Sequence, residues 1–105
     1  MALEFTDSNF QAEVLDSDKL SVIDFWAEWC GPCRMVGPVV EQIAQSYSDK
    51  IKVVKLNVDE NPETTRAFSV MSIPTLILFK DGVEVEKVIG FQPKDALTEL
   101  IVKHS

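Results

Sequence analysis

The sequence predicts one α/β domain, spanning residues 1–105, in which helices cover both faces of a mixed β-sheet. Segments with the length and apolar content of strands alternate with segments of helical periodicity, and this order calls for parallel strands joined by right-handed crossovers. The last two strand segments are joined by Lys80-Asp81-Gly82, a hairpin signal that makes them antiparallel. With 105 residues and 46% hydrophobic content, the chain is long enough to bury a core of its own.

Each element follows from local signals along the chain. Thr6 or Asp7 can cap an early helix, and Asn61-Pro62 marks a turn before a short one. Apolar residues at helical spacing mark the longest helix, although Gly37-Pro38 should interrupt its hydrogen-bond ladder and kink it. The predicted elements are strands at residues 3–5, 20–27, 51–58, 74–79 and 83–88, and helices from residue 7 to about 15, at 34–47, at 63–68 and after Gln92-Pro93.

The two cysteines of the chain, Cys30 and Cys33, stand three residues apart at the start of the longest predicted helix. Residues at this spacing lie roughly 5–6 Å apart at Cβ, so a slightly tightened first turn brings the sulfurs within disulfide geometry. The unpaired N–H groups and the dipole of the helix N-terminus favour a thiolate, which identifies Cys30 as the nucleophile. Pro32 fits the first turn and stiffens it, and Gly31 keeps the approach to Cys30 open.

Two other uses of the cysteine pair are disfavoured. A zinc site needs four ligands, and the remaining candidate, His104, stands next to the last residue. A purely structural disulfide that encloses two residues removes little loop entropy from the unfolded chain. The sequence therefore favours redox chemistry that needs no metal and no bound organic cofactor.

Composition bears on the compartment and on the partners. The N-terminus has no basic region followed by an apolar run, and no stretch of 18 apolar residues occurs, so we expect a cytoplasmic protein without a membrane span. A mature form whose secretory signal had been removed would have the same sequence. A net charge of −7 leaves no basic stripe for nucleic acid and favours proteins as partners. We expect the chain to be a monomer.

Several further segments of the chain belong with the cysteine motif. In order they are Asp24-Phe25-Trp26-Ala27, Trp29-Cys30-Gly31-Pro32-Cys33, Lys55, Asp59, Ser72-Ile73-Pro74-Thr75 and Gly90. Together these segments resemble the thioredoxin family over essentially the full length of the chain. The resemblance implies a thioredoxin fold, with a five-stranded mixed sheet flanked by four helices. It also implies that the chain reduces disulfides of client proteins with electrons from a flavin-containing thioredoxin reductase.

Asp24 and Lys55 interrupt apolar runs in two neighbouring predicted strands. Burial should raise the pKa of the Asp24 carboxyl, and a buried acid beside a cysteine pair suggests a proton acceptor. Lys55 is its expected partner, because both residues occupy positions that can point beneath the active-site helix. The alternatives are an edge-strand aspartate in water and a lysine whose long stem reaches solvent.

The resemblance also implies a shallow apolar groove for an extended client segment. The Ile73-Pro74 bond would be cis, with Pro74 facing the cysteines and the backbone of Ile73 free to pair with the client. Three residues depart from the common family pattern, since Met71 replaces a frequent basic residue, Ser72 a frequent glycine and Phe91 a small residue. We expect these three to affect partner preference. The predicted groove residues are Trp29, Gly31, Pro32, Ile73, Pro74, Gly90 and Phe91.

The predicted mechanism is dithiol–disulfide exchange. Cys30 attacks a client disulfide, Cys33 resolves the mixed disulfide, Asp24 accepts the Cys33 proton and Lys55 modulates Asp24. Because Cys33 lies further into the helix, we expect it to be more buried than Cys30. Trp26 is expected to pack in the core beneath the active site.

One rival function is a disulfide oxidase or isomerase, disfavoured because Gly31-Pro32 supplies no polar group to stabilise the thiolate strongly. The other is an interaction module that does not need its sulfurs, and the presence of both cysteines and Asp24 counts against it.

Overall fold

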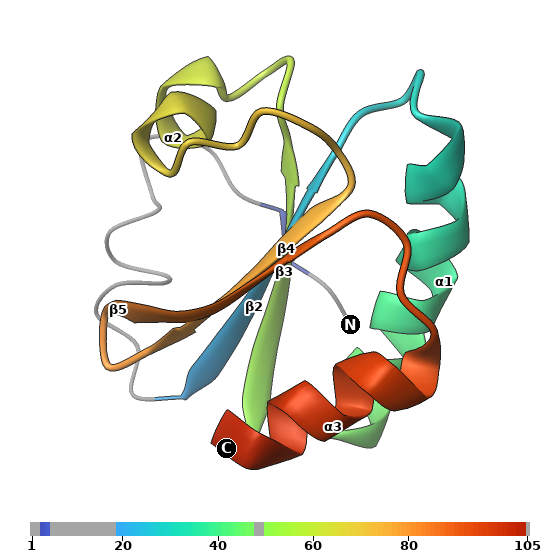
Figure 1. Cartoon of the computed structure of the whole chain (residues 1–105), viewed down its shortest axis with the longest axis vertical. Coiled ribbons are helices and arrows are strands. Elements are labelled where there is room, and N and C mark those ends of the chain that lie inside the picture. The colour runs from blue at the N-terminus through green and yellow to red at the C-terminus, as the bar shows by residue number, and fades with distance from the viewer. Residues whose placement is uncertain (1–2, 5–18, 48–49, 105) are drawn as a thin grey trace.

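The computed structural model describes residues 3–4, 19–47 and 50–104, and the helix predicted between residues 7 and 15 lies outside them. Strands and helices alternate along the described chain up to a final hairpin and helix (Figure 1). In chain order the elements are β1 (Leu3–Glu4), β2 (Leu20–Trp26), α1 (Gly31–Ser46), β3 (Ile51–Asn57), α2 (Pro62–Ala67), β4 (Thr75–Lys80), β5 (Val83–Ile89) and α3 (Lys94–His104).

The strands form one mixed sheet in the order β1-β3-β2-β4-β5, which confirms the predicted α/β class with a mixed sheet. Three of the four predicted helices lie within the described residues. Strand β3 pairs in parallel with both β1 and β2, whereas β4 runs antiparallel to β2 and to β5. The β4–β5 hairpin turns at Asp81 and Gly82, which have φ angles of 53° and 79°. Positive φ at both positions gives a turn whose twist matches that of the flanking strands, so the predicted hairpin signal is confirmed.

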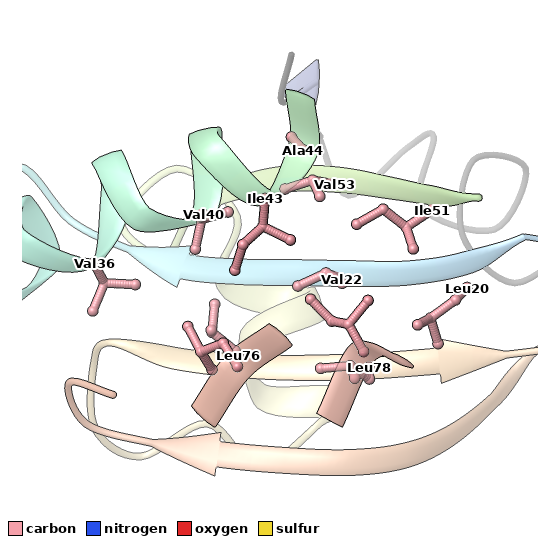
Figure 2. Close-up of a cluster of buried hydrophobic side chains, with 12 residues drawn as sticks. Leu20, Val22, Val36, Val40, Ile43, Ala44, Ile51, Val53, Leu76 and Leu78 are labelled. Atoms are coloured by element: carbon pink, nitrogen blue, oxygen red, sulfur yellow. The ribbon is translucent and has the colours of Figure 1, made fainter. Parts of the chain in front are cut away.

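The side chains of the sheet pack into two cores, one on each face. Helices α1 and α3 cover one face and α2 lies on the opposite side (Figure 1). Figure 2 shows Val36, Val40 and Ile43 pointing from α1 toward the sheet, where Val22 of β2 belongs to the same core. The core on the α1 face consists of Leu20, Val22, Val36, Val40, Ile43, Ala44, Ile51, Val53, Leu76, Leu78, Leu97 and Ile101, and the other core is built on Ile23, Phe25, Val54, Leu56, Ile77 and Phe79.

Helix α1 begins three residues before its predicted start, at Gly31, and places both cysteines at its N-terminus. Pro32 lies in the first turn, where its missing N–H has no intrahelical partner to lose. The helix continues through Pro38, so the proline removes one hydrogen bond of the ladder without ending the helix. The active-site turn and the long packed helix are therefore one continuous element.

Candidate active site

The two cysteines form a disulfide at the N-terminus of α1, with their Cα atoms 5.3 Å apart. Cys30 is the residue that caps the helix, and its Sγ accepts the backbone N–H of Cys33 at 3.2 Å. The first turn of α1 contains no acidic side chain to oppose negative charge on that sulfur. The end of a helix with such an N–H directed at it is a position that favours negative charge.

The two cysteines are almost equally buried, which contradicts the prediction. Cys33 was expected to be the more buried residue, but Cys30 is 4% exposed and Cys33 is 5% exposed. The reason is that Ile73 and Val58, from segments distant in sequence, pack against the cysteines and shield Cys30 as well. The residues differ instead in their surroundings, because Cys33 lines a cleft that Cys30 does not line.

This cleft, which we call the Asp24 cleft, runs beside α1 and has a volume of about 560 Å³. Asp24 and Cys33 both line it, so water can bridge the carboxyl and the second sulfur. Gly37 and Pro38 form part of its helical wall, and Glu41 lies one turn further along α1. The full lining is Asp24, Trp26, Ala27, Glu28, Cys33, Arg34, Gly37, Pro38, Glu41 and Lys55.

Asp24 is buried on the α1 face of the sheet, where it continues the row that contains Leu20 and Val22 of β2. Its residue is 1% exposed, and no hydrogen-bond donor reaches its Oδ1 among the described residues. Burial raises the pKa of this carboxyl from 3.8 to about 6, and the positive charge of Lys55 works in the opposite direction. The predictions of burial and of a raised pKa for Asp24 are confirmed.

Lys55 is the direct partner of Asp24 in the parallel β2–β3 register, and it lines the same cleft. Its Nζ lies over the Trp26 ring, 4.6 Å from the ring centroid, in a cation–π arrangement. The Lys55 ammonium therefore interacts both with the face of the Trp26 ring and, electrostatically, with the Asp24 carboxyl. Trp26, expected to pack beneath the active site, lies half-buried against the cysteines.

The loop before β4 lies against the disulfide as the predicted groove requires. The Ile73-Pro74 bond is cis, as the resemblance implied, and Ile73 packs against the cysteines. Two hydrogen bonds hold this loop, since Thr75 Oγ1 donates to the Ser72 carbonyl at 2.6 Å and the Gly90 N–H donates to the Pro74 carbonyl at 2.8 Å. The loop is thus tied to the first residue of β4 and to the residue that follows β5.

Of the predicted groove residues, Trp29 and Ile73 line one apolar cavity of about 390 Å³ together with Met71 and Ser72. Gly31 and Pro32 are exposed on the active-site turn. Gly90 has a φ of 88°, which favours glycine, and Phe91 after it is 43% exposed. Gly31, Pro32, Pro74, Gly90 and Phe91 do not line this cavity, so their contact with a client stays a prediction.

Three contacts at the site involve residues that sequence reasoning did not assign to it. The indole N–H of Trp29 donates to Asp59 Oδ2 at 2.8 Å, and Val58 packs against the cysteines. Arg34 donates from Nη2 to the Glu28 carbonyl at 2.9 Å. Arg34 directly follows the cysteine motif and Glu28 directly precedes Trp29, so proximity in the sequence was the available signal for both.

Within the described ranges, no cluster of three or more His, Cys, Asp or Glu residues is arranged to hold a metal ion. The helices among these residues are also too short or too polar to cross a membrane.

Comparison with known proteins gives one consistent result. A family model described as Thioredoxin matches residues 1–103. A protein named Thioredoxin 1 from a Nostoc species is 55% identical over 103 residues, which cover 98% of this chain and 96% of that protein. Thioredoxin from Alicyclobacillus acidocaldarius is 58% identical over 95 residues, 90% of each chain. Thioredoxin from Staphylococcus saprophyticus is 54% identical over 102 residues, 97% of this chain and 96% of its relative.

Proposed function

Because this chain belongs to the thioredoxin family and is a dithiol–disulfide oxidoreductase, we propose that its first half-reaction is an attack by the Cys30 thiolate on a client disulfide. A bond forms between Cys30 Sγ and one client sulfur, the client S–S bond breaks, and the second client sulfur leaves as a thiolate. The position of Cys30 at the N-cap of α1 supports this assignment, since the Cys33 N–H already points at its sulfur. In this proposal the whole chain, residues 1–105, forms one domain that carries both cysteines.

The second half-reaction closes the Cys30–Cys33 disulfide. Cys33 gives up its proton to Asp24 and attacks Cys30 Sγ, the mixed disulfide bond breaks, and the first client sulfur leaves as a thiolate. Two electrons have then passed from the cysteine pair to the client. The observation that carries the proposal is that Asp24 and Cys33 line one cleft, with the pKa of Asp24 raised to about 6. A carboxylate of this pKa is ionised at neutral pH and can accept the proton, directly or through water.

Lys55 modulates this base in the proposal. Its charge favours the ionised form of Asp24, and its contact with Trp26 keeps the ammonium from closing into a tight ion pair with the carboxylate. A tight pair would hold the pKa too low for a general base near neutrality. Lys55 is thus a positioning residue.

The proposed partners are disulfide-containing client proteins and a flavin-containing thioredoxin reductase, with the chain acting as a monomer in the cytoplasm. A client segment would lie in extended form along Ile73 and Pro74, beside Trp29 and the active-site turn. Gly31, Pro32, Gly90 and Phe91 would complete the groove.

Trapping experiments test the roles of the two sulfurs. Cys33→Ser should accumulate covalent complexes with clients, because the attacking sulfur remains and the resolving one is gone. Cys30→Ser is the matched control and should trap none. Non-reducing gels of lysates measure the adducts, and adducts on Cys30→Ser alone would reverse the assignment.

Single-turnover kinetics test the proton acceptor. Asp24→Asn should slow resolution of the mixed disulfide at pH 7 and should remove the part of the pH profile centred near pH 6, where the Asp24 carboxyl titrates. Formation of the mixed disulfide should keep its rate. Resolution at the wild-type rate with the wild-type pH profile would exclude Asp24 as the base.

A further inference from the structure

Two cavities meet at Trp29, and their linings differ in chemistry. The first, which we call the apolar cavity, has a volume of about 390 Å³ and is the one that contains Ile73. The second, which we call the acidic cavity, has a volume of about 510 Å³. The apolar cavity is lined by Trp29, Val58, Thr65, Val70, Met71, Ser72 and Ile73, and the acidic cavity by Glu28, Trp29, Asn57, Asp59 and Glu60.

The apolar cavity contains no charged side chain among the described residues that line it. Met71 is 94% exposed at its edge and Trp29 is 70% exposed between the two cavities. Exposed apolar surface of this kind, next to a reactive disulfide, is surface that a bound segment can cover. An apolar side chain of a client beside its attacked cysteine would fill this space.

The acidic cavity carries three carboxylates, from Glu28, Asp59 and Glu60, and no lysine or arginine of the described chain lines it. Arg34 donates to the Glu28 carbonyl, and it lines the Asp24 cleft and not the acidic cavity. Asp59 also accepts the indole N–H of Trp29, which holds that ring in place as the wall between the cavities. The three carboxylates are exposed to solvent, and none of the described residues that line this cavity carries a positive charge.

We propose that the preferred clients of this chain carry an apolar residue on one side of the attacked cysteine and basic residues on the other. The inference rests on the proposed function, because it places the client segment across Trp29 beside Cys30. The apolar residue enters the apolar cavity, and the basic residues lie beside Glu28 and Glu60. Charge complementarity of this kind raises association rates and discriminates between partners.

Disulfide-linked peptides with a fluorescence readout test this specificity. All carry leucine on one side of the attacked cysteine and two lysines or two glutamates on the other, and both sequence orders are made. We expect the lysine peptide to be reduced with a kcat/KM on the order of 3- to 10-fold higher than the glutamate peptide at low salt. The ratio should shrink as ionic strength rises.

Charge-removing variants locate the effect. Glu28→Gln/Glu60→Gln should bring the lysine-to-glutamate ratio close to one. Glu84→Gln/Glu99→Gln, in exposed positions on β5 and α3, changes the net charge equally and should leave the ratio unchanged. A further lysine peptide, with serine in place of leucine, measures the preference at the apolar position. Met71→Lys should reduce the advantage of the leucine peptide over this serine peptide by roughly 3-fold or more.

The outcomes distinguish a failure of the proposed client preference from a failure of the proposed function. Reduction of neither peptide by the wild-type chain would overturn the proposed function. Reduction of both peptides at equal rates would overturn the specificity alone. An equal loss of the ratio in both double variants would also overturn it, because the net charge of −7 would then account for the preference.

Discussion

Replacement of Asp24 by asparagine should raise the stability of the oxidised protein relative to wild type as pH increases from acid to neutral values. The carboxyl is buried without a donor to its Oδ1 among the described residues, so ionisation in the folded state loses hydration without full compensation. In the unfolded chain the same carboxyl is hydrated and titrates at its ordinary value of 3.8. An asparagine at this position cannot ionise in either state.

The magnitude follows from the difference between the two pKa values. A pKa that rises from 3.8 to about 6 corresponds to a penalty of about 3 kcal/mol, at about 1.4 kcal/mol for each pKa unit. Because the folded pKa is the higher one, the folded state binds more protons between the two values. The wild-type free energy of unfolding therefore falls as pH rises from about 4 to about 6, and the penalty is constant above that window.

Urea unfolding of the oxidised wild type and of Asp24→Asn, at intervals from pH 4 to pH 8, measures this difference. The stability of the variant relative to wild type should rise by up to about 3 kcal/mol between pH 4 and pH 8. Burying the amide adds an offset of about 1–3 kcal/mol if its N–H groups stay unpaired, but that offset does not depend on pH. The change with pH, and not the absolute difference, is thus the diagnostic quantity.

Two comparisons give the experiment its controls. Glu99→Gln removes an exposed carboxylate of α3 and should show no comparable pH dependence. Lys55→Met removes the charge that lowers the Asp24 pKa, so the window in which stability falls should extend to higher pH. A difference between Asp24→Asn and wild type that stays constant from pH 4 to pH 8 would refute the raised pKa. A stability of the variant relative to wild type that falls as pH rises would instead make the carboxylate a stabilising partner of Lys55.

Other predictions concern the packing around the site. Ile43→Ala should lower the free energy of unfolding by about 2–5 kcal/mol in urea, because Ile43 is 2% exposed in the core beneath α1. Lys87 donates from Nζ to the Phe68 carbonyl at 2.9 Å and so ties β5 to the C-terminus of α2. Lys87→Met should cost about 1 kcal/mol and increase hydrogen exchange at residues 69–72, and unchanged exchange there would count against the tie. The contact between His104 and Glu86, at 2.9 Å, lowers the pKa of the Glu86 carboxyl. The stability it contributes should be lost as pH falls through that lowered pKa, and His104→Gln should reduce this acid sensitivity in urea titrations.

Much of the fold follows from periodicity, because two-residue alternation and helical spacing are local properties of the chain. The burial of Asp24 could be predicted in this way, since its strand is apolar on both faces and its position continues the row of Leu20 and Val22. The burial of Cys30 could not be predicted, because it depends on Val58 and Ile73, which reach the cysteines only through the tertiary fold. The same holds for the two cavities beside Trp29.

The start of a helix was harder to predict where a side chain accepts a hydrogen bond from the free backbone N–H groups of the first turn. The start of α1 at Gly31 depends on the sulfur of Cys30 acting as a cap, a role that residue propensities assign to serine, threonine, aspartate and asparagine. The two-residue pairing of β1 with β3 is shorter than the predicted strand, and the rest of that prediction lies outside the described residues.

Successive side chains of β2 point to opposite faces of the sheet, and the chemistry depends on which face Asp24 occupies. Even-numbered residues of this strand, from Leu20 to Asp24, face α1, whereas Ile23 and Phe25 face the opposite core. Inserting or deleting one residue within β2 ahead of Asp24 would exchange Asp24 and Phe25 between the two faces, with a carboxyl in the apolar core and an aromatic ring in the cleft. A change of two residues would leave Asp24 on the α1 face. An insertion or deletion in β2 ahead of Asp24 therefore keeps the redox site intact only if it has an even number of residues. The loops outside the sheet are not restricted in this way.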